Sequence, residues 1–114
     1  MEKGESLMKT FEEYQAFQRE KQFYPQSGEF EGLVYAVLAM VGEAGECAND
    51  VKKIIRDYKG MIVPEHVEKL VLEMGDVLWY LSAMAHELGV TLDHVADMNK
   101  KKLDDRHTKK VAVG

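Results

Sequence analysis

Four carboxylate side chains form two similar pairs that could hold a metal ion. The pairs are Glu43 with Glu46 in the stretch VGEAGECAND, and Glu73 with Asp76 in the stretch VLEMGDVLWY. Each pair has a spacing of three residues, adjoins a glycine, and interrupts a segment that is otherwise suited to a buried helix. Carboxylates held close together raise each other's pKa, and a cation between them removes that conflict. The pattern therefore predicts either a metal site or a solvated acidic face.

The donor atoms of these four residues are all oxygen, and no histidine stands at ligand spacing from them. This favours Mg²⁺, or alternatively Mn²⁺, over zinc. It also argues against a di-iron bundle, which needs Glu-x-x-His on two helices. The two acid–histidine pairs at a spacing of three, His94 with Asp97 and Asp104 with His107, are interpreted as surface polar residues.

A group of opposite charge follows near the C-terminus, in the stretch DMNKKKLDDRH. Asn99, Lys102 and Arg106 are three and four residues apart, which places them on one face of a helix. An amide, an ammonium and a guanidinium can together bind a polyanion and form hydrogen bonds to the polar edge of the bound ligand. Cations near a helix C-terminus are also favoured by the helix dipole alone. With four carboxylates in the same chain, a site for a metal and a phosphate is the better account.

Four helices are predicted to carry these residues. Helix starts are indicated by the capping box Thr10–Glu13, by Pro64 and by Thr91, while Gly60 and Gly89 indicate ends. The expected helices are residues 11–21, 30–58, 64–88 and 92–106, with the first break at QFYPQSGE. Because there is no strand-like alternation, the fold class is all-α, a four-helix bundle with antiparallel long helices.

Each long helix carries an apolar stripe and a separate arc of acids. The stripe of the second helix is Val34, Val37, Val41, Ala44, Ala48, Val51 and Ile55. That of the third is Val67, Leu70, Met74, Leu78, Leu81 and Ala85. The acid arcs, with Asp50 beside Glu43 and Glu46, are offset from these stripes by similar angles. If the stripes pack together in an antiparallel pair, both acid arcs can border one cleft.

Length, charge and cysteine content narrow the class of protein. The chain has 114 residues, 46% of them hydrophobic, which fits one domain with a core. A formal net charge of -5 argues against binding polynucleotides or membrane surfaces, although a divalent metal can still attract a small anion. The single cysteine, Cys47, allows no internal disulfide, which fits a cytoplasmic protein. No run of 18 apolar residues is present, so no membrane span is expected.

Taken in order, Glu43-x-x-Glu46, Glu73-x-x-Asp76 and Asn99-x-x-Lys102-Leu103-x-x-Arg106 resemble the MazG-like nucleotide pyrophosphohydrolases. These belong to the all-α nucleoside triphosphate pyrophosphatase superfamily. The stretches GEAGE and MGDVLWYL also match that family. The resemblance covers residues 10–106, leaving residues 1–9 as a flexible leader and 107–114 as a short tail.

The resemblance implies Mg²⁺-dependent cleavage of (d)NTPs between the α and β phosphates, giving (d)NMP and pyrophosphate for pool control or house-cleaning. Carried over by residue, it implies that Glu43, Glu46, Glu73 and Asp76 are catalytic metal ligands. One of them, Glu46 or Glu43, would take the proton from the attacking water. Asn99, Lys102 and Arg106 would bind the substrate. It also implies a homodimer or a dimer of dimers, with a neighbouring subunit completing the cleft.

Two other functions remain open from the sequence. One is phosphoribosyl-ATP pyrophosphohydrolase in the same superfamily, although MGDVLWYL fits the MazG-like branch better. The other is a non-enzymatic helical interaction module that uses its apolar faces and keeps the acids as a relic or structural site.

Overall fold

The described part of the chain is entirely helical apart from its connecting segments. The computed structural model describes Met8 and residues 10–113, with side chains as far as His107. The helices are α1 (Phe11–Lys21), α2 (Phe30–Tyr58), α3 (Pro64–Glu87) and α4 (Leu92–Val113). The predicted all-α class with four helices is thereby confirmed. The predicted leader, residues 1–9, lies outside the described residues except for Met8.

Local sequence signals explain where the helices begin and end. Thr10 Oγ1 accepts a hydrogen bond of 3.1 Å from the backbone N–H of Glu13, which caps α1 as predicted. Lys59 and Gly60 both adopt positive φ, 55° and 80°, and close α2 at the predicted place. Gly89, at φ 73°, follows α3 in the same way. The exception is α4, which continues to Val113 instead of ending near Arg106.

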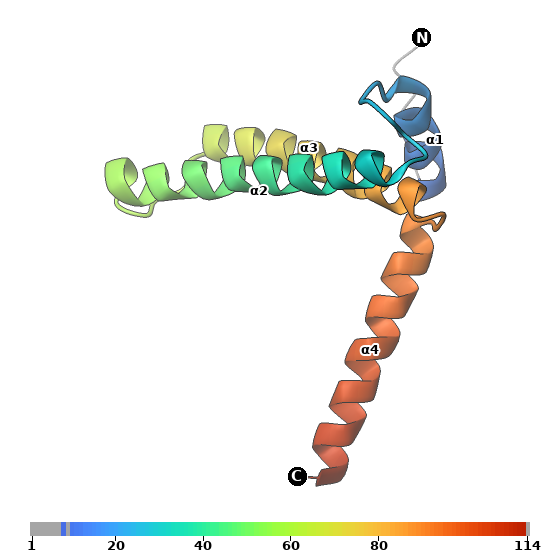
Figure 1. The fold of residues 1–114 in the computed structure, drawn as a ribbon. Coiled ribbons are helices and arrows are strands. Elements are labelled where there is room, and N and C mark those ends of the chain that lie inside the picture. Colours follow the sequence, from blue (N-terminus) through green and yellow to red (C-terminus); the bar gives the residue numbers. More distant parts are fainter. Residues whose placement is uncertain (1–7, 9, 114) are drawn as a thin grey trace.

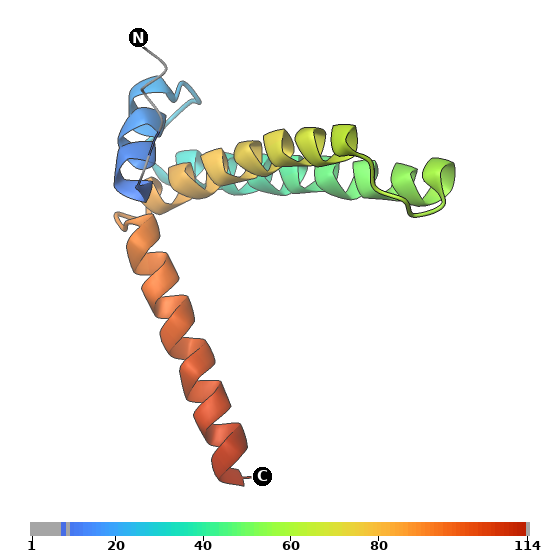
Figure 2. The same cartoon turned by 180° about the vertical axis from the view of Figure 1, so that it is seen from behind.

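The helices are arranged as an antiparallel pair with two outlying helices. Figures 1 and 2 show α2 and α3 side by side, α1 lying across one end of the pair, and α4 extending away from that end. Among the described helices, α4 approaches α1 and α3 but not α2. Within one chain, α4 therefore does not pack alongside the α2–α3 pair.

The register of the α2–α3 pair is fixed by contacts along its length. Near the connecting loop, the Tyr58 ring packs edge-on against His66, with ring centroids 4.5 Å apart. Further along, Lys69 Nζ donates a hydrogen bond of 2.9 Å to Asp50 Oδ1. The buried residues of the two helices are mostly small or polar: Gly32, Ala36, Asp50 and Ile54 in α2, and Ser82, Ala83 and Ala85 in α3. Gly32 packs against the loop before α2, since a Cβ there would clash with the carbonyl oxygen of Gln26.

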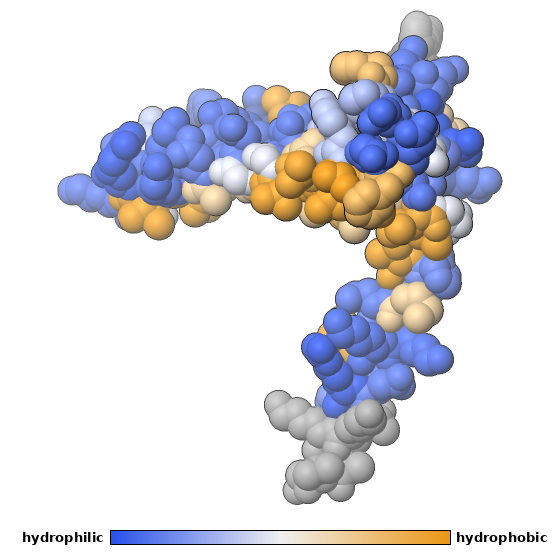
Figure 3. All heavy atoms as spheres, in the orientation of Figure 1, coloured by the Kyte–Doolittle hydropathy of each residue, from blue (hydrophilic) through white to orange (hydrophobic). Residues whose placement is uncertain are grey.

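The apolar stripes do not form the contact between α2 and α3. Val41 is 57% exposed, Ile55 66% and Met74 62%, whereas Asp50 is only 8% exposed. The two helices meet instead along the arcs that carry the acids, so the large apolar side chains remain outside. Figure 3 shows hydrophobic residues gathered along the underside of the α2–α3 pair and on the first turns of α4.

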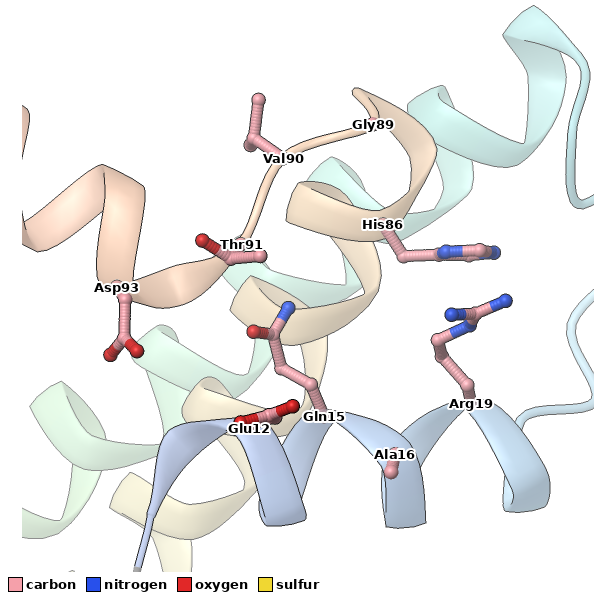
Figure 4. A pocket seen from close by; sticks show the side chains of 9 residues that line it. All are labelled: Glu12, Gln15, Ala16, Arg19, His86, Gly89, Val90, Thr91 and Asp93. Atoms are coloured by element: carbon pink, nitrogen blue, oxygen red, sulfur yellow. The ribbon is translucent and has the colours of Figure 1, made fainter.

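The elbow between the pair and α4 is held by α1. Gln15 Oε1 accepts a hydrogen bond of 2.9 Å from the backbone N–H of Leu92, at the start of α4. Phe17 packs edge-on against Trp79 of α3 at a centroid distance of 5.8 Å. Figure 4 shows Gln15 beside Thr91 in the hollow at this elbow. These contacts fix only the first turn of α4, and residues 93–107 are exposed.

A second tether joins the loop before α2 to the end of α3. The Glu87 carboxylate accepts hydrogen bonds from the hydroxyls of Tyr24 and Ser27, at 2.5 and 2.6 Å, and from Gly28 N–H at 2.8 Å. Burial opposes ionisation of Glu87, but bonds from Ser27, Tyr24 and Gly28 lower its pKa overall. Burial and the bond to Glu87 raise the pKa of Tyr24 to about 12. The tether is therefore a phenol–carboxylate pair across neutral pH.

No helix in the described part of the chain has the length and apolarity to cross a membrane.

We expect Glu87→Gln to lower the free energy of unfolding at pH 7 by about 1–3 kcal/mol, because the acceptor loses its charge. Urea unfolding measures this, and Glu68→Gln, an exposed site on the same helix, is the control. The lowered pKa of Glu87 means that its contribution is present above its usual pKa of 4.5 and is lost as the pH falls. The raised pKa of Tyr24 means that its contribution is present below pH 10 and is lost as the pH rises through about 12. A stability difference that does not shrink in acid would contradict this role.

Candidate functional site

The predicted acids border the contact between α2 and α3, which we call the acid seam. It comprises Glu43, Glu46 and Asp50 of α2 with Glu73 and Asp76 of α3. Asp50 is buried, Glu43 and Glu73 are half-buried, and Glu46 and Asp76 are exposed. The structure thus brings both predicted pairs to one side of the antiparallel pair.

Asp50 and Glu73 lie against each other across the acid seam. Contact with Asp50, followed by burial, raises the pKa of Glu73. Contact with Glu73 and then with Lys69 lowers the pKa of Asp50. Of the two carboxylates, Glu73 is therefore the one that binds a proton more readily.

Lys69 is the positive group nearest to this contact. Its Nζ lies 2.9 Å from Asp50 Oδ1, and its side chain is 61% exposed whereas that of Asp50 is 9% exposed. The pKa of Lys69 is raised first by Asp50 and then also by Glu73 and Glu46. The ammonium therefore sits at the rim of the acid seam and neutralises part of its charge from the solvent side.

Two carboxylate oxygens of the seam are buried without a hydrogen-bond partner among the described residues. They are Oδ2 of Asp50 and Oε1 of Glu73. A buried acceptor without a partner costs free energy, more so when it is charged. A hard cation is a suitable partner for two such oxygens, since Mg²⁺ and Mn²⁺ prefer carboxylate ligands. The donor chemistry of the seam thus fits a divalent cation.

The remaining acids do not close around a common point. In the part of the chain that is described, no three carboxylate, imidazole or thiol groups are close enough to hold a metal ion. Glu46 and Asp76 are exposed, and long exposed side chains change rotamer readily. An ion bound at the seam would therefore require these two side chains to turn toward it.

Two tyrosines border the end of the seam near Asp76. Burial raises the pKa of Tyr80, and Tyr35, Glu43 and Asp76 raise it further. Burial and the charge of Asp76 raise the pKa of Tyr14, whose hydroxyl lies 3.5 Å from the carbonyl oxygen of Gly75. Both phenols therefore stay protonated at neutral pH and can act as hydrogen-bond donors beside the carboxylates.

Cys47 also lies in the acid seam, between Glu46 and Asp50. Burial raises the pKa of its thiol, and Glu73, Asp50 and Asp76 raise it further. A thiolate is the nucleophilic form of cysteine, and this environment disfavours it. The thiol therefore does not have the setting of a catalytic nucleophile.

The three predicted substrate-binding residues lie elsewhere. Asn99, Lys102 and Arg106 are exposed on α4, which extends away from the acid seam. Lys102 and Arg106 share a shallow hollow on α4 with Met98, Lys101 and Asp105. Since α4 does not approach α2 among the described helices, the structure does not unite these groups with the acids in one chain.

Two residues are not in the predicted site set, Asp50 within the seam and Lys69 at its rim. Asp50 belongs to the predicted acid arc, four residues after Glu46, but it is not among the four proposed ligands. Lys69 stands four residues before Glu73, which places both on one face of α3. The four-residue spacing indicates from sequence that Lys69 lies near Glu73. Only the register of the α2–α3 pair shows that Lys69 also contacts Asp50.

Comparisons with known proteins give one family and one relative. The family model described as the MazG nucleotide pyrophosphohydrolase domain matches residues 35–111. The chain is 42% identical over 104 residues to the Gene 37 protein of Mycobacterium phage L5, covering 89% of this chain and 91% of that protein. No solved structure matches the chain with significance.

Proposed function

Because the chain belongs to the MazG nucleotide pyrophosphohydrolase family, we propose that it cleaves (d)NTPs between the α and β phosphates. The products are a nucleoside monophosphate and pyrophosphate, and the role is pool control or removal of aberrant nucleotides. The observation that carries this proposal is the acid seam. A contact between two helices is ordinarily filled by apolar side chains, whereas here it holds opposed carboxylates with unpartnered oxygens.

In this proposal the four motif carboxylates, Glu43, Glu46, Glu73 and Asp76, hold Mg²⁺, for which Mn²⁺ can substitute. When bound, such a cation neutralises phosphate oxygens and activates a water for in-line attack. Glu46 or Glu43 accepts the proton of that water, since both lie on the side of α2 that faces the seam. Tyr80 and Tyr14, which remain protonated, supply neutral donors next to Asp76.

The cations of α4 reach the triphosphate, in this proposal, through assembly of more than one chain. Asn99, Lys102 and Arg106 cannot meet the seam of their own chain, because α4 extends away from it. A neighbouring subunit would bring its α4 to the acids, so that guanidinium and ammonium groups face the phosphates. A homodimer or a dimer of dimers provides this arrangement.

The exposed surface of the chain supports assembly. Its accessible area is 8695 Å², against about 6300 Å² for a compact monomer of 13.0 kDa. Its radius of gyration is 17.7 Å, against about 13 Å for a compact chain of 114 residues. The difference in area exceeds the roughly 800 Å² that each partner buries in a standard interface.

The apolar groove between α2 and α3 is the best candidate for the surface that a second copy covers. It has a volume of about 600 Å³. Its lining residues are Ala44, Cys47, Val71, Met74, Gly75, Val77, Leu78 and Leu81. Several of them belong to the exposed stripes, and covering them would complete a core that one chain leaves open.

We expect purified protein with Mg²⁺ to release pyrophosphate and a monophosphate from at least one member of a nucleotide panel. The panel contains normal and modified (d)NTPs and phosphoribosyl-ATP. Release from phosphoribosyl-ATP alone would assign the chain to that other activity. Release from none would favour a non-enzymatic helical module.

On the substrate so identified, Glu46→Gln and Asp76→Asn are each expected to lower kcat/KM by more than about 100-fold, because each removes a metal ligand. Circular dichroism should show unchanged helix content. Glu65→Gln, at an exposed position in the first turn of α3, is the control. Retained activity in both seam variants would refute the assigned site.

For assembly, we expect the wild-type chain to show at least twice its 13.0 kDa mass in light scattering after gel filtration. Met74→Glu should shift the mass toward the monomer, because it places a charge in the apolar groove. Leu72→Glu is the control, since Leu72 is also exposed but lies on the opposite side of α3 at about 100° per residue. A monomeric wild type, or equal effects of both variants, would count against this interface.

A further inference from the structure

The position of Asp50 is not explained by its ion pair. A lysine–aspartate pair needs no burial, and Lys69 itself is 61% exposed. Asp50 nevertheless has only 9% of its side chain exposed, and the pair uses only its Oδ1. Oδ2 is left buried and without a partner among the described residues. The carboxylate is therefore oriented, with one oxygen toward the rim and the other into the seam.

Glu73, whose side chain lies against Asp50, has an oxygen in the same condition. Glu73 Oε1 is likewise buried and unpartnered, and the two side chains are in contact across the helices. Asp50 also lies one helical turn after Glu46, on the same arc of α2. Asp50 and Glu73, from two helices, therefore each contribute a buried oxygen without a partner to this contact, and the exposed Glu46 lies one turn away on α2.

We propose that Asp50 is a fifth carboxylate of the metal site and binds the same divalent cation as Glu73. Lys69 acts as a positioning residue, because it holds Oδ1 and thereby leaves Oδ2 directed at the ion. This inference rests on the metal site of the proposed function. It goes beyond the four motif acids by adding a ligand from outside both motifs.

The test is a titration of the full chain with Mn²⁺ alone, followed by calorimetry and without nucleotide. We expect Asp50→Asn to weaken binding at least about 10-fold, since an oxygen ligand is replaced by an amide. Asp57→Asn is the matched control. It removes the same charge from the same helix, but Asp57 pairs with Arg56 outside the seam. The Mn²⁺ affinity of Asp57→Asn should stay within about twofold of that of the wild type.

A second readout separates a metal ligand from a structural residue. Without metal, Asp50→Asn should melt no lower than the wild type, because the new amide can donate a hydrogen bond to Glu73 Oε1. The rise in melting temperature on adding Mn²⁺ should be smaller than in the wild type. Unchanged Mn²⁺ affinity in folded Asp50→Asn would overturn the proposal. So would a lower melting temperature without metal combined with an undiminished rise on adding Mn²⁺.

These outcomes are independent of the enzymatic assay. A wild type that binds Mn²⁺ through Asp50 but releases no pyrophosphate would refute the proposed function and leave the ligand in place. A wild type that releases pyrophosphate while Asp50→Asn binds Mn²⁺ normally would refute the ligand and leave the function in place.

Discussion

The structure depends on one contact that is unfavourable in isolation, the approach of Asp50 and Glu73 across the helix pair. Two carboxylates in contact away from water repel unless a proton or a cation lies between them. Lys69 relieves only the outer part of this charge, since it bonds to a single oxygen of Asp50. Folding of the pair therefore leaves negative charge at the contact that Lys69 neutralises only in part. This links the energetics of the α2–α3 contact directly to the chemistry of the site.

The same contact explains why so much apolar surface is outside. A helix has a limited circumference, so an arc used for acids and small residues cannot also carry the large apolar side chains. Ala36 is fully buried on α2, whereas Val41, Ile55 and Met74 remain exposed. These exposed apolar side chains are of the kind that a hydrophobic core would ordinarily contain. If chains assemble as proposed, the apolar surface outside the pair is what links the acid seam inside it to that assembly.

Helix boundaries were accessible from sequence because their causes are local. Thr10, Pro64, Lys59–Gly60 and Gly89 act through hydrogen bonds and backbone conformation within a few residues. Periodicity also placed Glu43, Glu46 and Asp50 on one arc. Which arc of α2 meets α3 is a non-local property, and hydrophobicity alone favoured the wrong one. The reason is that the apolar stripe suits a partner that the sequence of a single chain does not specify. The hydrogen bond between Lys69 and Asp50 depends on how α2 and α3 are aligned, so it could not be predicted from the sequence either.

The place of α4 follows from the polarity of its surface. Beyond Leu92, the helix offers mainly charged side chains and isolated apolar ones such as Val95, Met98 and Leu103. It therefore gains little by packing along its own α2–α3 pair, and the bond from Leu92 to Gln15 directs it outward. Acids and cations that folded against each other in one chain would neutralise one another and leave less charge for a metal and a phosphate. On the proposed function, their separation keeps the acid seam available to the metal cation and the basic face of α4 available to the phosphates. In the proposed function, the two meet where chains come together around a ligand that carries the metal and the phosphates at once.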